Sequence, residues 1–224
     1  MALLKLKVVC RWAINMVRLP IAFCLIFYGC RGNEDTLPFY NTADFTAEWI
    51  KPNDPKYTSI HTIANFNLYS QLGYVINKDT LAGHVYLANF FFSTCPSICP
   101  LMMGNLNRVQ QAFLNNSSVK LVSFSVMPWR DSVESLRAYG KVHGIDPRKW
   151  YLLTGNKNDI YQLSRQSYFS EKRLGLTKAN DDFLHTESLL LIDKQSRIRG
   201  IYAATDTAQV RRAIDDIKIL LKEG

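Results

Sequence analysis

The chain has 224 residues, of which 47% are hydrophobic and 21% charged, an ordinary globular composition that suits one domain with an appendage. The formal net charge is +8, but four basic residues lie near the start and no acidic residue precedes Glu34. Without that segment the net charge falls to about +4. The remaining basic residues are scattered rather than gathered into a stripe, so we expect no nucleic-acid partner.

Residues 1–30 have the form of an export signal. Basic residues precede the uncharged run Leu19–Gly29, which is far shorter than the ~20 apolar residues that span a bilayer. A signal peptide therefore explains the run better than a transmembrane helix. The run ends in Gly29-Cys30, which resembles a bacterial lipoprotein box, so we expect lipidation at Cys30. An uncleaved signal anchor is the alternative. In both cases the folded part is exported, faces the periplasm or another extracytoplasmic space, and is anchored to a membrane through its N-terminus.

The boundary between tether and domain is expected near residue 56. Residues 31–56 are polar, contain three prolines and show no sustained periodicity, which indicates a flexible tether. From Tyr57 the sequence changes to short strand-like runs, among them Phe66–Tyr69 and Tyr74–Ile76. Residues 57–224 are therefore predicted to form the folded domain.

The strongest strand signal is His84–Phe92, nearly continuous in apolar residues, as expected for a buried central strand. The cysteine-containing segment Ser93–Pro100 follows, then a helical stretch to about Asn115 and a second buried strand, Val119–Val126. Strand, helix and strand joined by short connections predict a parallel, right-handed crossover.

The second half of the chain alternates between helix and strand signals. Asp131 and Glu134 give an Asp-x-x-Glu start typical of a capping box, which predicts a helix to about His143. The later elements are a short strand at 151–154, a helix at 158–166, a polar insertion at 170–182, a hairpin of strands 188–192 and 198–202, and a final helix with one apolar stripe over 210–221.

The order of these elements defines the expected fold class. Cysteines that follow the carboxyl end of a central strand and open the next helix lie where α/β sheets place their chemistry. We therefore predict an α/β, thioredoxin-like fold with extra N-terminal strands and an insertion before the C-terminal hairpin.

Cysteine usage points to one pair. Cys10 and Cys24 lie in the signal and Cys30 at its end, so the folded domain keeps Cys95 and Cys99. A disulfide between residues four apart would constrain the unfolded chain very little, so stability is a poor reason for the pair. A helix N-terminus favours a thiolate and lowers its pKa. Soft thiolates select Cu(I) or Zn, and the spacing is wider than Cys-x-x-Cys, so a metal site and a redox pair both stay open.

Four segments, in the same order, resemble the Sco/SenC family. Tyr86–Pro100 is similar to its apolar strand leading into Cys-Pro-x-x-Cys-Pro, and Ser125–Asp131 to its Ser-Val-Asp-Pro-x-Arg-Asp stretch. Trp150 with Leu153–Gly155 resembles Trp-x-x-Leu-Thr-Gly, and His185-Thr186 with the strand after it resembles the family's histidine segment. The similarity extends from about Phe66 to the C-terminus and is specific in combination.

This resemblance implies a copper site with Cys95, Cys99 and His185 as ligands and Cu(I), Cu(II) or both as the metal. The position of His185 supports it independently, because residues entering the C-terminal hairpin of thioredoxin-like folds pack beside the cysteine turn. No metal role is expected for the other histidines, His61, His84 and His143.

Two positions depart from the family pattern. Ser97 stands where an aspartate is usual between the cysteines, and Met127 replaces the acidic residue of Ser-Val-Asp-Pro. Both changes remove a carboxylate expected near the copper site. We expect Met102, Met103 and Met127 to fill space rather than bind copper, because methionine beside apolar strands and helices usually packs in the core.

The resemblance implies two functions that can coexist. A metallochaperone would deliver copper to the binuclear copper site in subunit two of cytochrome c oxidase. A thiol–disulfide reductase would keep the cysteines of that subunit reduced, with Cys95 and Cys99 as its catalytic redox pair. Other periplasmic copper carriers or thioredoxin-like reductants are further expected partners. A peroxide-reducing or redox-sensing relative ranks last, because the peroxiredoxin pattern Pro-x-x-x-Thr-x-x-Cys is missing.

Overall fold

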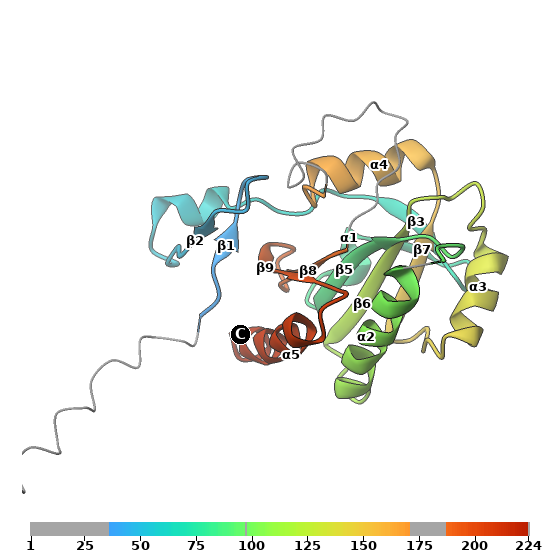
Figure 1. The fold of residues 1–224 in the computed structure, drawn as a ribbon. Coiled ribbons are helices and arrows are strands. Elements are labelled where there is room, and N and C mark those ends of the chain that lie inside the picture. The colour runs from blue at the N-terminus through green and yellow to red at the C-terminus, as the bar shows by residue number, and fades with distance from the viewer. Residues whose placement is uncertain (1–35, 97, 171–186, 224) are drawn as a thin grey trace, which may run out of the picture. The chain divides into compact units, whose positions relative to one another are not determined.

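A seven-stranded mixed sheet forms the centre of the computed structural model, which describes residues 36–96, 98–170 and 187–223 (Figure 1). The strand order is β4-β3-β7-β6-β5-β8-β9. β5, β6 and β7 are parallel to one another, and the other neighbours pair antiparallel. The strands are β3 (Asn67–Ser70), β4 (Val75–Asn77), β5 (Val85–Phe91), β6 (Val119–Ser125), β7 (Trp150–Thr154), β8 (Ser188–Ile192) and β9 (Ile198–Ala203).

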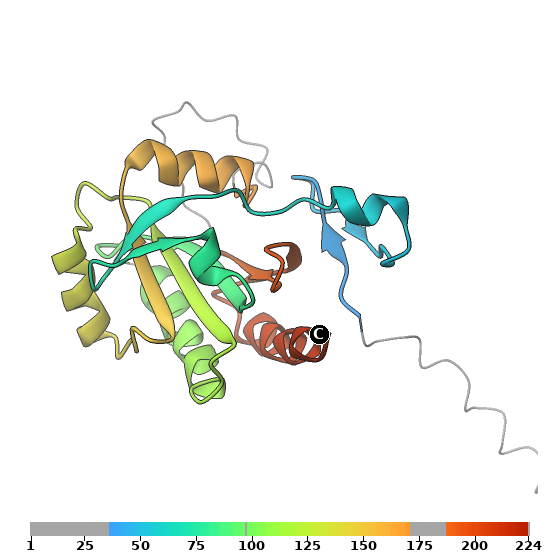
Figure 2. The same cartoon turned by 180° about the vertical axis from the view of Figure 1, so that it is seen from behind.

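Helices cover both faces of the sheet (Figures 1 and 2). Side chains of α2, α3 and α5, such as Leu106, Leu136 and Ile217, share one hydrophobic cluster, and Ile160 of α4 belongs to the cluster on the opposite face. Within the described ranges, no helix combines the length and apolar character needed to cross a bilayer. The helices are α1 (Lys78–Leu81), α2 (Ile98–Ala112), α3 (Val133–Val142), α4 (Lys157–Gln166), α5 (Thr207–Lys222) and the 3-10 turn η1 (Pro55–Ser59).

The central strand β5 is buried at every position, because helices lie on both of its faces. Leu87 and Phe91 point into the α2 cluster, whereas Tyr86 and Phe90 point into the α4 cluster. The predicted central strand, parallel crossover, C-terminal hairpin and final helix are all confirmed. The α/β class is therefore correct.

The predicted tether differs from the structure. The described residues 36–56, which the sequence assigns to the tether, belong to the folded unit. It includes the small antiparallel hairpin of β1 (Phe39–Tyr40) and β2 (Ala47–Glu48), and Phe39 is buried. Strands of two residues carry no readable periodicity, and this segment is fixed by partners far along the chain.

Arg199 of β9 is the main partner of this segment. Its guanidinium donates to the carbonyl oxygens of Leu37 (2.6 Å) and Pro38 (3.1 Å) and lies 4.2 Å from the ring centroid of Phe39. It also pairs with Asp193 (3.3 Å) and Glu223 (2.7 Å), with its side chain 4% exposed. A planar guanidinium with five donors can satisfy all of these acceptors at once. We call this group the Arg199 clasp.

We predict that Arg199→Ala lowers the free energy of unfolding by about 3 kcal/mol, because it leaves buried acceptors and carboxylates without their cation. Urea unfolding followed by circular dichroism measures the change. The matched control is Arg212→Ala, whose side chain is 78% exposed and whose pair with Asp216 spans 3.8 Å. That control should cost less than about 1 kcal/mol. Equal effects of the two substitutions would contradict a stabilising role for the clasp.

Candidate functional site

The cysteine pair lies directly after the carboxyl end of β5. The Cys95 amide donates to the carbonyl of Phe92 (3.3 Å), which turns the chain, and Cys99 lies in the first turn of α2. Cys95 is 7% exposed and Cys99 3%, and the two, both within the described ranges, are thiols not joined by a disulfide. The side chains of the two cysteines are hydrogen bonded to each other.

The surroundings of Cys99 raise its pKa to about 12. Burial is the largest cause, and the neighbouring Cys95 and the negative charge of Asp131 add to it, whereas a backbone hydrogen bond from Phe92 opposes it. The expected lowering at the helix N-terminus is overcome by the loss of water. Without metal, Cys99 is thus a protonated thiol at neutral pH.

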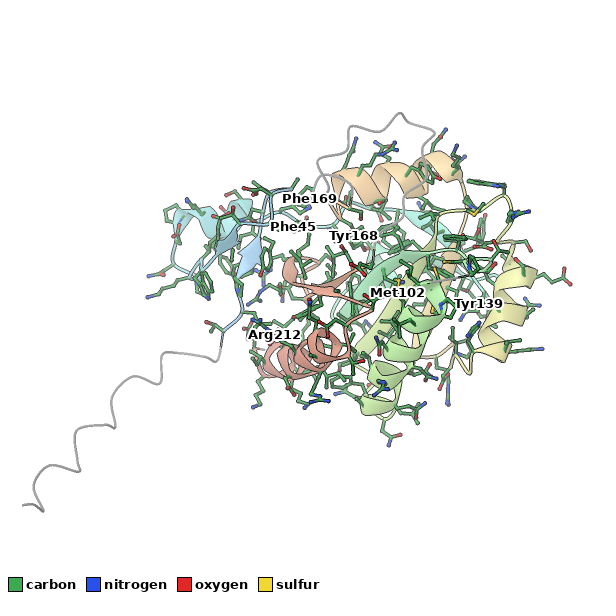
Figure 3. All side chains as sticks on the ribbon, in the orientation of Figure 1. Phe45, Met102, Tyr139, Tyr168, Phe169 and Arg212 are labelled. Carbon is green, nitrogen blue, oxygen red and sulfur yellow. The ribbon has the colours of Figure 1, made fainter. Side chains whose placement is uncertain are left out.

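The walls around the pair come from the core. Met102 and Met103 of α2 are 0% and 2% exposed and belong to the same hydrophobic cluster as the cysteines, as expected for core filling (Figure 3). Met127 is partly exposed, and its amide donates to the Ser125 hydroxyl (3.2 Å).

Tyr139 of α3 belongs to the same surroundings (Figure 3). Its ring lies between those of Phe91 (centroids 5.7 Å) and His143 (4.0 Å). Burial raises the pKa of Tyr139, and the nearby Cys99 and Asp131 raise it further. Its hydroxyl therefore stays protonated. In the sequence, Tyr139 had no signal that distinguished it from an ordinary helix residue.

Asp131 corrects the predicted capping box. The N-cap of α3 is Ser132, whose hydroxyl accepts from the Ser135 amide (3.1 Å). Asp131 is instead fully buried, and its carboxylate accepts from the backbone N–H of Ser93 (3.1 Å), the Ser93 hydroxyl and the Ser125 hydroxyl (2.5 Å). The carboxylate of Asp131 therefore lies against the cysteine loop. Ser97 and Met127, the two departures from the family pattern, carry no carboxylate.

The other predicted site residues, His185 and Cys30, lie outside the described residues. Among those described, no three His, Cys, Asp or Glu side chains form a metal-binding group. The register between β5 and β8 pairs Asn89 with Leu189, and the Glu187 carbonyl accepts from the Ala204 amide (2.8 Å). The chain thus enters β8 at the end of the sheet that carries the cysteines, three residues after position 185.

The remaining histidines have local partners. The His61 ring nitrogen Nε2 is 2.9 Å from the Ser167 carbonyl oxygen, and the His84 ring nitrogen Nδ1 is 3.2 Å from that of Ala82. His143 stacks on Tyr139. Within the described part of the chain, none of the three belongs to a group of three or more His, Cys, Asp or Glu side chains that could hold a metal ion.

A buried dithiol after the central strand of an α/β sheet, with an antiparallel hairpin beside that strand, defines a thioredoxin-like dithiol protein. The model of the SCO1/SenC family matches residues 55–222, so the chain belongs to this family. The family assignment made from the motifs is thereby confirmed.

Solved structures share the fold. A SCO1/SenC family lipoprotein from Bacillus anthracis is 30% identical, with a TM-score of 0.64 over 72% of this chain and 96% of that one. Arabidopsis thaliana ScoI with copper bound is 25% identical, with a TM-score of 0.55 over 71% and 98%. BsSco, described as having a disulfide switch and as a member of the Sco family of cytochrome c oxidase assembly proteins, is 24% identical, with a TM-score of 0.61 over 71% and 92%. The predicted thioredoxin-like fold is confirmed.

We predict that Cys99 of the folded, reduced protein reacts with iodoacetamide at pH 8 at least about 100-fold more slowly than in the urea-unfolded chain, because little thiolate is present. Mass spectrometry of each labelled cysteine measures the rate, which should rise toward pH 12. Because the folded pKa lies above the unfolded value of 9.0, the thiol's contribution to stability is complete below pH 9 and is lost as the pH rises toward 12. Equal rates in folded and unfolded chains would contradict the buried, protonated thiol.

Proposed function

We propose that this protein is a copper metallochaperone that carries copper on Cys95, Cys99 and His185 and assists assembly of the binuclear copper site in subunit two of cytochrome c oxidase. The observation that carries the proposal is the buried pair of hydrogen-bonded thiols at the carboxyl end of β5. Membership in the SCO1/SenC family and the copper-bound relative from Arabidopsis support copper as the cargo.

The chemistry of the pair suits a soft ion. Two thiols that lose their protons become soft donors, which select Cu(I) over hard cations. Because Cys99 is protonated without metal, binding releases protons and strengthens as the pH rises. A third ligand would raise the affinity for the copper ion, so that other thiols compete for it less effectively. His185 is the proposed donor, since Glu187 begins the described approach to β8 at the cysteine end of the sheet.

The proposal that cytochrome c oxidase is the partner rests on family membership. BsSco is described as belonging to a family of cytochrome c oxidase assembly proteins, and the present chain shares its fold. A binuclear copper centre needs metal delivered to reduced cysteines. A protein that holds copper on a reduced dithiol can deliver that metal. Other copper carriers would load this protein, and thioredoxin-like reductants would return its pair to the thiol form.

A thiol–disulfide reductase acting on the oxidase cysteines is the second candidate. The observation in its favour is the direct hydrogen bond between the two cysteine side chains, because neighbouring thiols can close to a disulfide while reducing another. Thiol exchange needs the cysteines alone, whereas a three-ligand copper site also needs the imidazole. His185 therefore separates the two functions.

We propose that the protein works outside the cytoplasm, attached to a membrane through lipidated Cys30. The related Bacillus anthracis protein is described as a lipoprotein. Leu37 is held by the Arg199 clasp, so six residues, 31–36, separate it from Cys30. Seven extended residue steps reach at most about 25 Å. The tether is therefore shorter than the sequence pattern alone indicates.

We expect residues 31–224 to bind one equivalent of Cu(I) and to show a thiolate-to-Cu(II) absorption band. Cys95→Ala should abolish the band, and His185→Ala should weaken Cu(I) binding by more than about 100-fold, beyond the effect of losing an outer-shell partner. Competition with a chromophoric chelator measures the affinity. His143→Ala is the matched control and should bind as the parent does. Parent-like affinity in His185→Ala would remove the imidazole from the site and favour the reductase.

Deleting the gene should lower the copper content of the purified oxidase, because its binuclear site fills inefficiently without a donor. Metal analysis of the oxidase, from cells grown with and without added copper, measures the loss. The intact gene should restore the content, and a gene carrying Cys99→Ser should not. A fully loaded oxidase in the deletion strain grown without added copper would contradict an assembly role.

A further inference from the structure

Asp131 is the one buried carboxylate beside the cysteine loop in the described part of the chain. It is 0% exposed, and within the described ranges no lysine or arginine pairs with it. A buried charge without a counter-ion is costly unless hydrogen bonds satisfy it. Asp131 does not cap α3, because Ser132 is the N-cap of that helix. The burial of the Asp131 carboxylate therefore needs another explanation.

The hydrogen bonds of Asp131 tie three segments together. Ser93, two residues before Cys95, donates both its amide and its hydroxyl to the carboxylate. Ser125 ends β6 and donates its hydroxyl to the same carboxylate. The Asp131 amide in turn donates to the carbonyl of Met127 (2.9 Å), which fixes the turn that presents the carboxylate. The cysteine loop, the end of β6 and the turn before α3 thus form one hydrogen-bonded unit.

We propose that Asp131 is a positioning residue of the dithiol site: it holds the loop that carries Cys95, and its fixed negative charge favours Cu(II) over Cu(I) at the two sulfurs. This inference rests on the proposed copper-binding function. It assigns to this chain a carboxylate that neither Ser97 nor Met127 can supply.

The preference for Cu(II) follows from the net charges of the two copper-bound forms. Two thiolates with Cu(I) carry a net charge of −1, and with Cu(II) they are neutral. A nearby fixed negative charge therefore repels the Cu(I) form more than the Cu(II) form. Ser93, two residues before Cys95, donates its amide and its hydroxyl to Asp131, which places the carboxylate against the loop that carries this sulfur. Removing its charge should shift the balance toward Cu(I).

The test compares Asp131→Asn with the full-length protein in detergent. Asparagine keeps the size of the side chain and one acceptor oxygen but loses the charge and an acceptor for Ser93. We expect amide hydrogen exchange at Ser93, measured by NMR on the metal-free protein, to speed up at least tenfold. We also expect the ratio of Cu(I) to Cu(II) affinity to rise about tenfold, a 59 mV higher reduction potential for a one-electron couple. Glu134→Gln, an exposed acid three residues away, is the matched control and should change neither quantity.

Three outcomes decide the matter. Ser93 exchange within twofold of the parent, in a variant that melts like the parent, overturns the positioning role. Faster exchange with an unchanged potential keeps the positioning role and overturns the charge preference. If the parent itself binds no copper, the proposed function fails, and Ser93 exchange in metal-free protein still decides the positioning role. Ser125→Ala removes the donor to Asp131 and the acceptor of the Met127 amide but no charge, so it should speed exchange without the tenfold change in ratio. It replaces Asp131→Asn if that variant does not fold.

Discussion

Burial of the two cysteine side chains at the carboxyl end of β5 is the constraint on which the rest of the site depends. The helix N-terminus offers the stabilisation that usually makes cysteines reactive, yet Cys99 is 3% exposed and its thiol keeps its proton. Desolvation acts on the anion itself, whereas the helix contributes partial charges, so desolvation prevails. A buried, protonated thiol is a weak nucleophile, and it can bind a ligand whose positive charge replaces the proton. Soft copper ions meet that condition.

The two ends of β5 lie near different features of the structure. Its carboxyl end leads into the cysteines, whereas Tyr86, near its amino end, pairs with Ile192 beside the Arg199 clasp. The clasp fixes Leu37 and so determines where the chain leaves the folded unit. Five residue steps of a strand, about 16 Å, separate Tyr86 from Phe91. The clasp that holds Leu37 and the cysteine pair thus lie near opposite ends of the same strand.

Local patterns determined most of the fold but only part of the site. The unbroken apolar run of β5 and the stripe of α5 are properties of adjacent residues, so they could be read directly. Residues 37–48 could not, because their order depends on Arg199, about 160 positions away. Asp131 was misassigned for a related reason. Asp-x-x-Glu fits a capping box as well as it fits a buried carboxylate followed by a serine cap, and only Ser93, 38 positions earlier, distinguishes the two.

The departures from the family pattern acquire a physical meaning once Asp131 is in place. Ser97 and Met127 remove two acidic side chains of the family pattern, whereas Asp131, the last residue of the stretch similar to Ser-Val-Asp-Pro-x-Arg-Asp, is retained. A single carboxylate, held by Ser93 and Ser125, supplies negative charge without adding a mobile oxygen that competes with sulfur for the metal. Because Ser93 lies two residues before Cys95, a displacement of this loop would strain the hydrogen bonds from Ser93 to Asp131, so the buried carboxylate resists movement of the segment that carries the first cysteine.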